Sequence, residues 1–550
     1  MPAIYYHPEA FSISSPKLMG RNAAGESFLR GYLKHSKSKE FWAQVEQSEH
    51  AIDFANKVLN SGRLEQVRSV NKSSLKALSQ AEVLFYPGPD IGTQAFHRTF
   101  HGNGLWSLCG ITHTTSSERA MDAIVDLITS PIQPWDALIC TSNAVKDNVE
   151  KILQAQIHYL KDRLGITKFV APQLPVIPLG IHTDDFNFHK DEIAQSRKNL
   201  GISENSLVVL YLGRLSFHAK AHPLAMYQAL EKAINKTNQK VVLIECGWHA
   251  NDEVAKIYQE TAEEFCPNLK LINLDGRNAD NRKIAWASAD IFCSLSDNIQ
   301  ETFGIVPIEA MAAGIPVVVS DWDGYKDTVR DGIDGFRIPT NMPQVGLGKD
   351  LAYRHALGID SYDLYCGLNC SLISVDIEST AKAFEKLFLS GELRSKMGES
   401  GRKRAREIYD WRVIIRKYEV LWEKLNEIRK IESTKNKKPL NHPWPARMDP
   451  FHGFTSYPTN RINKESIVAL NSEDLPKAIN KALNIRQIKM FRFAELILPS
   501  KEEITVILTS VQENAQSVGK IIEEIDQQRK PYVMRSLSWL LKIGVLIKIS

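Results

Sequence analysis

Two glutamates, Glu301 and Glu309, stand eight residues apart in a segment that reads ETFGIVPIEAMAAG from residue 301 to residue 314. An apolar run at residues 315–320 follows and is expected to form a buried strand. The segment itself is expected to open a helix, with Glu301 before it and Glu309 inside it. Because this spacing covers roughly two helical turns, one carboxylate can face a ligand at the start of the helix while the other reaches its far end. Paired glutamates are also common on solvated helix faces, so the interpretation depends on the strand–loop–helix–strand setting.

The start of this helix also suits an anion. The backbone N–H groups of Phe303, Gly304 and Ile305 would have no partners within the helix, and the helix dipole adds partial positive charge there. This combination commonly binds phosphate groups. We therefore expect a ligand with a pyrophosphate at this position.

Two cations, Arg214 and Lys220, follow another apolar run at residues 207–212. An arginine gives forked donors to phosphate oxygens and a lysine gives a compact charge, so the pair could neutralise a diphosphate. The alternative interpretation is two solvated cations on a surface loop.

Together these motifs resemble the retaining glycosyltransferases of the GT-B fold, and family 4, the glycosyl transferases group 1, in particular. The resemblance covers roughly residues 1–430. It implies that Arg214 and Lys220 hold the diphosphate of a nucleoside-diphosphate sugar, that Glu301 holds hydroxyls of the donor sugar, and that Glu309 accepts hydrogen bonds from the ribose. It also implies four residues whose backbone covers sugar and phosphate: Thr302, Phe303, Gly304 and Ile305.

The sequence departs from the family's pattern near both motifs. Ala221 stands where glycine is usual, and two extra residues separate Arg214 from Lys220. Thr302 replaces a frequent glycine, which need not disturb the backbone donors of its neighbours.

Further site residues follow from the same resemblance. Gly20 and Gly25 match an N-terminal glycine loop that approaches the diphosphate and the acceptor, and Arg277 begins a loop that lines the nucleotide base. His113 follows a strand of the first lobe, where the family often places a histidine against the donor sugar; a structural role for His113 is the alternative. The expected catalytic residues are His113, Arg214, Lys220 and Glu301.

An Asp-Trp-Asp sequence, Asp321 to Asp323, raises the question of a metal. Asp-x-Asp binds a divalent ion in the other glycosyltransferase fold, GT-A, but here it follows the Glu-x7-Glu helix by one strand. We interpret it as a turn and expect no metal and no other cofactor, because cationic side chains already supply phosphate neutralisation. No Walker loop, zincin or serine-hydrolase motif occurs in the sequence.

The order of apolar runs predicts an α/β protein of the GT-B type. Continuous apolar strands that alternate with helical patterns favour parallel, doubly wound sheets. We expect a first Rossmann-like domain at 1–180 and a second at 181–410, with a hinge near 178–182. The remaining expectations are an insertion at about 341–376, a crossing helix at 411–430, a linker at 431–447, and a mainly helical, winged-helix-like domain at 448–550. The strands expected in the first domain are residues 3–6, 82–86, 108–111, 137–141 and 174–177, and those in the second are 207–212, 240–245, 269–274, 290–295 and 315–320.

Composition limits the class of protein. The 550 residues carry 68 basic and 64 acidic side chains, so no bulk attraction to nucleic acid is implied. The seven scattered cysteines indicate reduced thiols. The N-terminus lacks the pattern of a signal peptide, and no apolar run reaches the roughly 18 residues of a membrane span. We therefore predict a cytoplasmic protein, with peripheral contact to the inner face of the membrane left open.

The C-terminal segment supports several interpretations. Packing or oligomerisation is favoured over nucleic-acid binding because residues 531–550 carry few cations, while residues 539–547 could also lie on a membrane. We predict a retaining hexosyltransferase of bacterial glycan or glycolipid biosynthesis, with a nucleotide sugar as donor and a glycan, lipid-linked or other hydroxyl acceptor. The rival hypotheses are a non-catalytic GT-B scaffold and a nucleotide-sugar epimerase or phosphorylase of the same fold.

Overall fold

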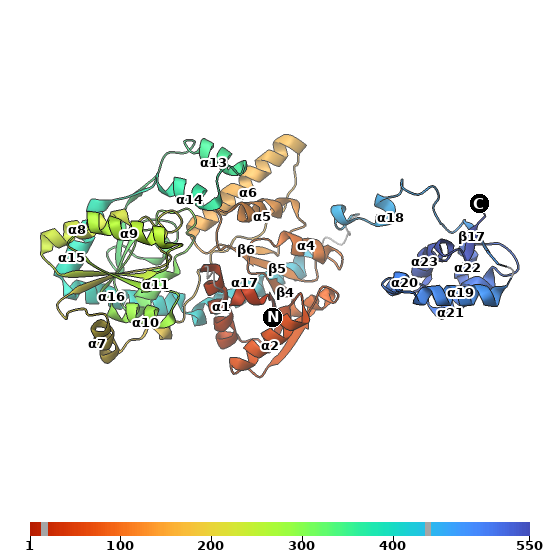
Figure 1. Cartoon of the computed structure of the whole chain (residues 1–550), viewed down its shortest axis with the longest axis horizontal. Helices are drawn as coiled ribbons and strands as arrows, with labels where there is room; N and C mark the ends of the chain where they lie inside the picture. The colour runs from red at the N-terminus through yellow and green to blue at the C-terminus, as the bar shows by residue number, and fades with distance from the viewer. Residues whose placement is uncertain (13–19, 435–441, 473, 550) are drawn as a thin grey trace. The chain divides into compact units, whose positions relative to one another are not determined.

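The computed structural model describes residues 1–12, 20–434, 442–472 and 474–549. The chain divides into two compact units, Met1–Trp444 and Pro445–Ser550 (Figure 1). The first unit contains two α/β lobes and the helix that crosses between them, and the second is smaller and mainly helical. The predicted fold class is confirmed.

The first lobe is built on a parallel six-stranded sheet in the order β3-β2-β1-β4-β5-β6. Successive side chains of a strand point to opposite faces, so Leu84 belongs to one buried cluster and Phe85 to another. Because helices cover both faces, the central strands read as continuous apolar runs. The strands are β1 (Pro2–Tyr5), β2 (Glu40–Gln44), β3 (Gln66–Val70), β4 (Val83–Phe85), β5 (Ser107–Ile111) and β6 (Ala137–Ile139). The helices are η1 (Pro8–Phe11), α1 (Gly20–His35), α2 (Ser48–Asn60), η2 (Leu75–Ala77), α3 (Leu78–Ala81), α4 (Gly92–Thr99), α5 (Glu118–Thr129) and α6 (Asn143–Leu164).

The second lobe repeats this topology, with the strand order β12-β11-β10-β7-β8-β9. In each lobe the first strand therefore lies beside the fourth, β1 beside β4 and β7 beside β10. The strands are β7 (Leu207–Leu212), β8 (Val241–Gly247), β9 (Lys270–Asp275), β10 (Ile291–Ser294), β11 (Val317–Ser320) and β12 (Gly335–Ile338). The helices are η3 (Thr183–Phe186), α7 (Lys190–Asn199), α8 (Leu224–Thr237), α9 (Asp252–Phe265), α10 (Ala279–Ser288), α11 (Ile305–Ala313), α12 (Tyr325–Thr328), α15 (Ile377–Leu389), α16 (Gly391–Arg404) and the π-helical η4 (Ala405–Tyr409).

An insertion at residues 340–375, called the excursion below, follows β12 of the second lobe. Its base is a short antiparallel pair, β13 (Thr340–Asn341) and β14 (Ser374–Val375). Between these strands the chain forms two helices, α13 (Lys349–Ala356) and α14 (Tyr362–Cys370). The sequence alone indicated an insertion here but not its helices.

Some strands differ from those expected. Residues 174–177 form no regular strand and contribute one isolated bridge, from Val176 to Cys140 just after β6. The sequence analysis missed β2, β3 and β12. Strands β3 and β12 lie at the edges of their sheets, and β2 begins and ends with polar residues, so their apolar signal is short.

The crossing helix α17 (Trp411–Glu432) returns the chain to the first lobe. Its Trp411 ring lies so close to Gly31 and Gly180 that a Cβ on either glycine would come within 2.6 Å of the ring. The Trp411 indole N–H donates to Ser27 Oγ at 2.7 Å. At the hinge, Ile181 N donates to Tyr409 O at 2.8 Å, so the two chain segments that join the lobes are hydrogen-bonded to each other.

The second unit has a three-stranded antiparallel sheet in the order β16-β15-β17. Its core contains the buried side chains of Leu508, Leu537 and Leu540. Helix α23 is followed by strand β17, and the winged-helix-like assignment stays a prediction. The strands are β15 (Ile467–Leu470), β16 (Gln516–Ser517) and β17 (Leu546–Lys548). The helices are η5 (Pro445–Arg447), α18 (Pro450–Gly453), α19 (Leu475–Gln487), α20 (Lys489–Arg492), η6 (Glu495–Ile497), α21 (Lys501–Ser510), α22 (Val518–Ile521), η7 (Ile522–Glu524) and α23 (Lys530–Lys542).

Among the described residues, no helix combines the length and the apolar character needed to cross a membrane.

The end of the first unit predicts the result of truncation. Trp444 stacks on Phe96 with ring centroids 5.0 Å apart, and Pro443 O accepts from Thr99 Oγ1 at 3.0 Å. A chain that ends at Trp444 should fold as a soluble protein with one cooperative melting transition. A chain that ends at Lys430 should melt at a lower temperature, because it lacks this stacking, worth about 0.5–1.5 kcal/mol beyond area burial. Differential scanning calorimetry of both truncated chains tests this; an insoluble chain ending at Trp444 would show that the unit needs residues 445–550.

Candidate active site

Three of the expected donor-binding residues, Arg214, Lys220 and Glu301, lie where the strand order of the second lobe reverses. Open α/β sheets bind ligands outside the carboxyl ends of their strands, at the point where neighbouring strands lead off in opposite directions. Here that point lies between β7 and β10. The loop after β7 carries Arg214 and Lys220, and the loop after β10 carries Glu301. The topology thus brings together residues that are about 80 positions apart in the sequence.

Only one nitrogen of the Arg214 guanidinium group, Nη2, is hydrogen-bonded within the described part of the protein. Its Nη2 donates to Ala219 O and to Gln300 Oε1, both at 2.8 Å. Among the described residues, Nε and Nη1 of Arg214 donate to no protein acceptor. The guanidinium group is therefore oriented by the protein and keeps donors for a ligand.

Lys220 and Glu301 form an ion pair across the two loops. Burial opposes the charged form of Glu301, but attraction to Lys220, the hydrogen bond from Lys220 and backbone hydrogen bonds together outweigh it. The backbone N–H groups of Thr302 and Phe303 also point to this carboxylate, and the pKa of Glu301 is lowered. The backbone donors expected to meet an anion are thus partly directed at Glu301.

Gly304 sets the start of the helix that carries Glu309. Its φ of 77° is unfavourable for residues with a Cβ, and a Cβ there would overlap the ring of Tyr325. Helix α11 begins at the next residue, Ile305, and ends before Gly314, which has a φ of 79°. The segment therefore forms a short helix with glycines at both ends, as its sequence predicts.

Glu309 is part-exposed and accepts no hydrogen bond from any described residue. The protein atoms around its carboxyl nevertheless exclude enough water to raise its pKa to about 7, with attraction to Arg282 opposing the rise. Two further carboxyls, those of Glu245 and Asp297, have pKa values raised to about 7 by burial. Tyr227 donates to Glu245 at 2.6 Å, and the backbone of His222 donates to Asp297 at 3.3 Å.

The first lobe contacts this site directly. Thr302 Oγ1 donates to His113 O at 3.0 Å, and Ser142 Oγ donates to Thr302 O at 2.8 Å. The backbone N–H of Asn143 donates to Asp327 Oδ2 at 2.7 Å. The loop that follows β5 and the start of α6 thus lie against the Glu301 loop, and His113 lies beside Thr302.

Comparison with known proteins agrees with this arrangement. Residues 192–345 match the family model described as Glycosyl transferases group 1. The structure of HepE from Anabaena, solved in complex with UDP, is similar to this chain with a TM-score of 0.51 and 14% identity, over 77% of this chain and 99% of that chain.

The fold is GT-B.

Curated relatives match a part of the GT-B unit. An uncharacterised glycosyltransferase from Methanocaldococcus jannaschii is 29% identical over 30% of this chain and 40% of its own length. The phosphatidyl-myo-inositol mannosyltransferase of Mycobacterium tuberculosis is 31% identical over 31% of this chain and 40% of its own length. The chain thus spans about two fifths of these relatives' length.

Three further residues expected to bind the donor, Gly20, Gly25 and Arg277, lie in local structures that the sequence analysis did not predict. Gly20 and Gly25 are helical rather than part of a loop, because α1 begins at Gly20 and Gly25 lies inside that helix, where a Cβ would overlap Ala10 O; their contact with the donor stays a prediction. Arg277 makes a two-pronged contact with Asp275 at 2.8–3.2 Å and is exposed. Arg282, on α10, is the arginine whose charge acts on Glu309.

The two aspartates of the Asp-Trp-Asp sequence lie in different surroundings. Asp321 pairs with Arg337 at 3.4 Å, whereas Asp323 is half-buried and accepts from Ser142 Oγ at 3.4 Å. Burial raises the pKa of Asp323 well above its usual range, and its φ of 44° is that of a turn. In the described part of the chain, no group of three or more potential ligands is arranged to hold a metal ion.

The sequence analysis missed Gln300, Arg282 and Tyr362 as members of the site. Gln300 precedes Glu301 directly, so its neighbourhood could have drawn attention to it. Tyr362 could not be found in this way, because it lies in the excursion, 62 residues beyond Gln300.

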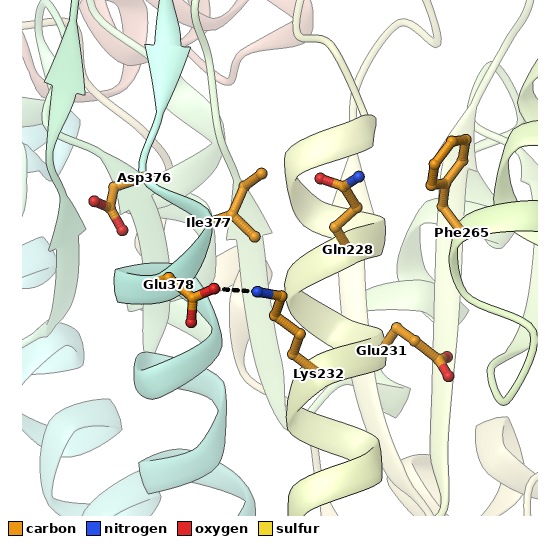
Figure 2. A pocket seen from close by; sticks show the side chains of 7 residues that line it. All are labelled: Gln228, Glu231, Lys232, Phe265, Asp376, Ile377 and Glu378. Atoms are coloured by element: carbon orange, nitrogen blue, oxygen red, sulfur yellow. Dashed lines mark hydrogen bonds and ion pairs between the residues drawn. The ribbon is translucent and has the colours of Figure 1, made fainter.

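A separate hollow of about 530 Å³ lies between α8 and α15 (Figure 2). Lys232 and Glu378 form an ion pair across it, and Glu231 accepts from Asn268 at 2.6 Å. None of its lining residues is an expected donor-binding residue, so we do not assign the hollow to donor binding.

The pKa of Glu309 predicts a pH dependence of ligand binding. If the carboxylate accepts hydrogen bonds from ribose hydroxyls, its ionised form binds better than its protonated form. Since its pKa is raised to about 7, affinity for a nucleoside diphosphate should increase by about tenfold from pH 6 to pH 8. Isothermal titration calorimetry at several pH values tests this. The Glu309→Gln variant is the control, because the ligand phosphate, Glu245 and Asp297 still titrate in it; an equal slope in both proteins would contradict the assignment.

Proposed function

We propose that this chain is a retaining glycosyltransferase that transfers a sugar from a nucleoside-diphosphate sugar to an acceptor hydroxyl. The observation that carries the proposal is the meeting of Arg214, Lys220 and Glu301 at the reversal point of the second sheet. The GT-B fold and the family match of residues 192–345 support it.

The expected chemistry is the stabilisation of a leaving diphosphate. As the bond from the anomeric carbon breaks, negative charge grows on the diphosphate and positive charge on the sugar. Arg214 offers Nε and Nη1, and Lys220 offers its ammonium group once the ligand competes with Glu301 for it. The N-terminus of α11 adds a partial positive charge.

We infer substitution on the front face of the sugar. The acceptor oxygen bonds to the anomeric carbon on the side from which the diphosphate departs, and the acceptor proton passes to the departing phosphate oxygen. Glu301 is ion-paired with Lys220 and its pKa is lowered, which favours a role in holding sugar hydroxyls over one as a nucleophile. His113 is the first-lobe residue that we assign to the donor sugar.

The relatives suggest donors and acceptors to try. HepE was solved with UDP and with UDP-glucose, and the mycobacterial relative is named for mannose transfer to phosphatidyl-myo-inositol. We therefore propose a role in bacterial glycan or glycolipid synthesis, with UDP and GDP sugars as the first donors to test.

Calorimetry with a panel of nucleoside diphosphates, followed by mass spectrometry of products, tests the proposal. The expected result is binding of one nucleotide and a mass increase of one sugar on an acceptor alcohol. Binding of no nucleotide would favour a scaffold. Conversion of the nucleotide sugar without an acceptor would favour an epimerase, and a requirement for inorganic phosphate would favour a phosphorylase.

Activity should survive removal of divalent metals. Arg214 and Lys220 supply the positive charge that a metal ion supplies in other glycosyltransferases. We therefore expect turnover in about 5–10 mM chelator to stay within about twofold of the untreated value. This chelator concentration is roughly a thousandfold excess over trace metal. Initial rates before and after dialysis against chelator measure this. Loss of activity with rescue by Mn²⁺ would instead assign Asp321 and Asp323 as ligands.

A further inference from the structure

The excursion after β12 packs onto the donor-binding loops. Helix α14 turns the buried residues Cys366, Gly367 and Cys370 toward the loop that joins Arg214 to Lys220. A Cβ on Gly367 would come within 3.0 Å of the His218 side chain, and Cys370 Sγ lies 3.5 Å from Phe217 O. The close approach fixes the position of α14 over this loop.

The first residue of α14, Tyr362, makes two contacts with its hydroxyl group. Gln300 Nε2 donates to it at 3.0 Å, and it lies 2.8 Å from Ser116 Oγ. Because the amide donates to the phenol oxygen, the phenol proton is available for Ser116. Burial raises the pKa of Tyr362, so the hydroxyl stays protonated at neutral pH.

These contacts form a continuous chain from the first lobe to Arg214. Ser116 lies on the loop after β5, as His113 does, and contacts Tyr362 of the excursion. Tyr362 in turn accepts from Gln300 Nε2, and Gln300 Oε1 accepts from Arg214 Nη2. The orientation of the Gln300 amide is fixed because Arg214 can only donate, so Oε1 faces Arg214 and Nε2 faces Tyr362. The backbone N–H of Gln300 donates to Asn298 Oδ1 at 2.9 Å. Separation of the lobes would break the chain at Ser116.

We propose that Tyr362 is a positioning residue that orients Arg214 for the donor diphosphate when the two lobes are closed. Tyr362 acts through Gln300 and does not touch the substrate. The excursion therefore holds Arg214 in the orientation that the donor site needs. Because Tyr362 also contacts Ser116 of the first lobe, this orientation depends on closure of the two lobes. This inference rests on the proposed glycosyltransferase function.

A double-mutant cycle tests the proposal. Tyr362→Phe removes the hydroxyl alone and should lower kcat by about five- to tenfold, the cost of one net hydrogen bond. In the Arg214→Ala background the same change should lower kcat by less than twofold, because there is no guanidinium left to orient. Tyr365→Phe is the matched control on the same helix; its ring stacks on His355, and kcat should stay unchanged.

A second measurement does not depend on turnover. Hydrogen exchange of the ligand-free protein should become faster in Tyr362→Phe at residues 114–117 and 298–302, and stay unchanged in Tyr365→Phe. Equal exchange in both variants, or a Tyr362→Phe effect on kcat that is as large without Arg214 as with it, would overturn the positioning role.

The two proposals fail in different ways. If the wild-type protein binds no nucleotide and transfers no sugar, both the proposed function and the positioning role of Tyr362 are overturned. A wild-type protein that is active, with Tyr362→Phe equal to it in kcat and in exchange, overturns only the positioning role.

Discussion

The Glu301→Gln variant should lose about 10- to 100-fold in turnover while it binds free nucleoside diphosphate at least as tightly as the wild type. The sugar hydroxyls lose a charged acceptor, and a hydrogen bond to a charged group is worth about 1.5–3 kcal/mol. Free nucleotide carries no sugar, so that loss does not affect its binding. The same change weakens the hold on Lys220, which Glu301 binds in the ligand-free protein, and the diphosphate then competes for it more easily.

Glu309→Gln provides the matched comparison, because it changes the other glutamate of the pair in the same way. We expect it to weaken nucleotide binding and to affect turnover at saturating donor much less. Steady-state kinetics together with calorimetry on the free nucleotide separate the two variants. If Glu301→Gln binds nucleotide poorly and keeps its kcat, the roles of the two glutamates are reversed.

The Asp136→Ala variant should lower the free energy of unfolding by about 3–5 kcal/mol. Asp136 and Arg98 are fully buried and form two parallel hydrogen bonds at 2.6 and 2.7 Å. Asp136 also accepts from the backbone N–H groups of Leu108 and Gln133, each at 2.8 Å. Removal of the carboxylate leaves a buried guanidinium group without its counter-charge and two backbone donors without an acceptor.

Thermal unfolding of the chain that ends at Trp444, with and without the substitution, measures this effect. Asp122→Ala is the control, because Asp122 is exposed on α5 of the same lobe. A loss below about 1 kcal/mol for Asp136→Ala would mean that water enters and solvates Arg98 in the variant.

The positions of Arg214, Lys220 and Glu301 could be predicted from local sequence, because each follows a strand of the second lobe. Parallel strands of one sheet end at the same edge, so residues just beyond two neighbouring strands must lie near each other. The sequence also predicted that the segment opens a helix, and Gly304 supplies the backbone angles at the point where the loop turns into α11. The long apolar strands β7 and β8 could be predicted because both faces of their sheet are covered.

Sequence patterns failed where a residue's role depends on a distant partner. Gly25 reads like part of a phosphate-binding loop, but it is a contact between α1 and the turn η1. Arg277 and Arg282 are equally plausible neighbours of a nucleotide from sequence, and only the packing of α10 brings the charge of Arg282 close to Glu309.

The sequence by itself determined the alternation of strands and helices, the start of α11 at a glycine, and the identity of the charged residues after β7 and β10. These depend on local backbone preference and on the period of apolar residues, which neighbouring positions specify. The tertiary structure alone decided that Tyr362 meets Ser116, 246 positions away, and Gln300, 62 positions away. Such contacts depend on how the excursion packs on the lobe and how the lobes meet, and no local pattern encodes the distance between side chains that the fold brings together.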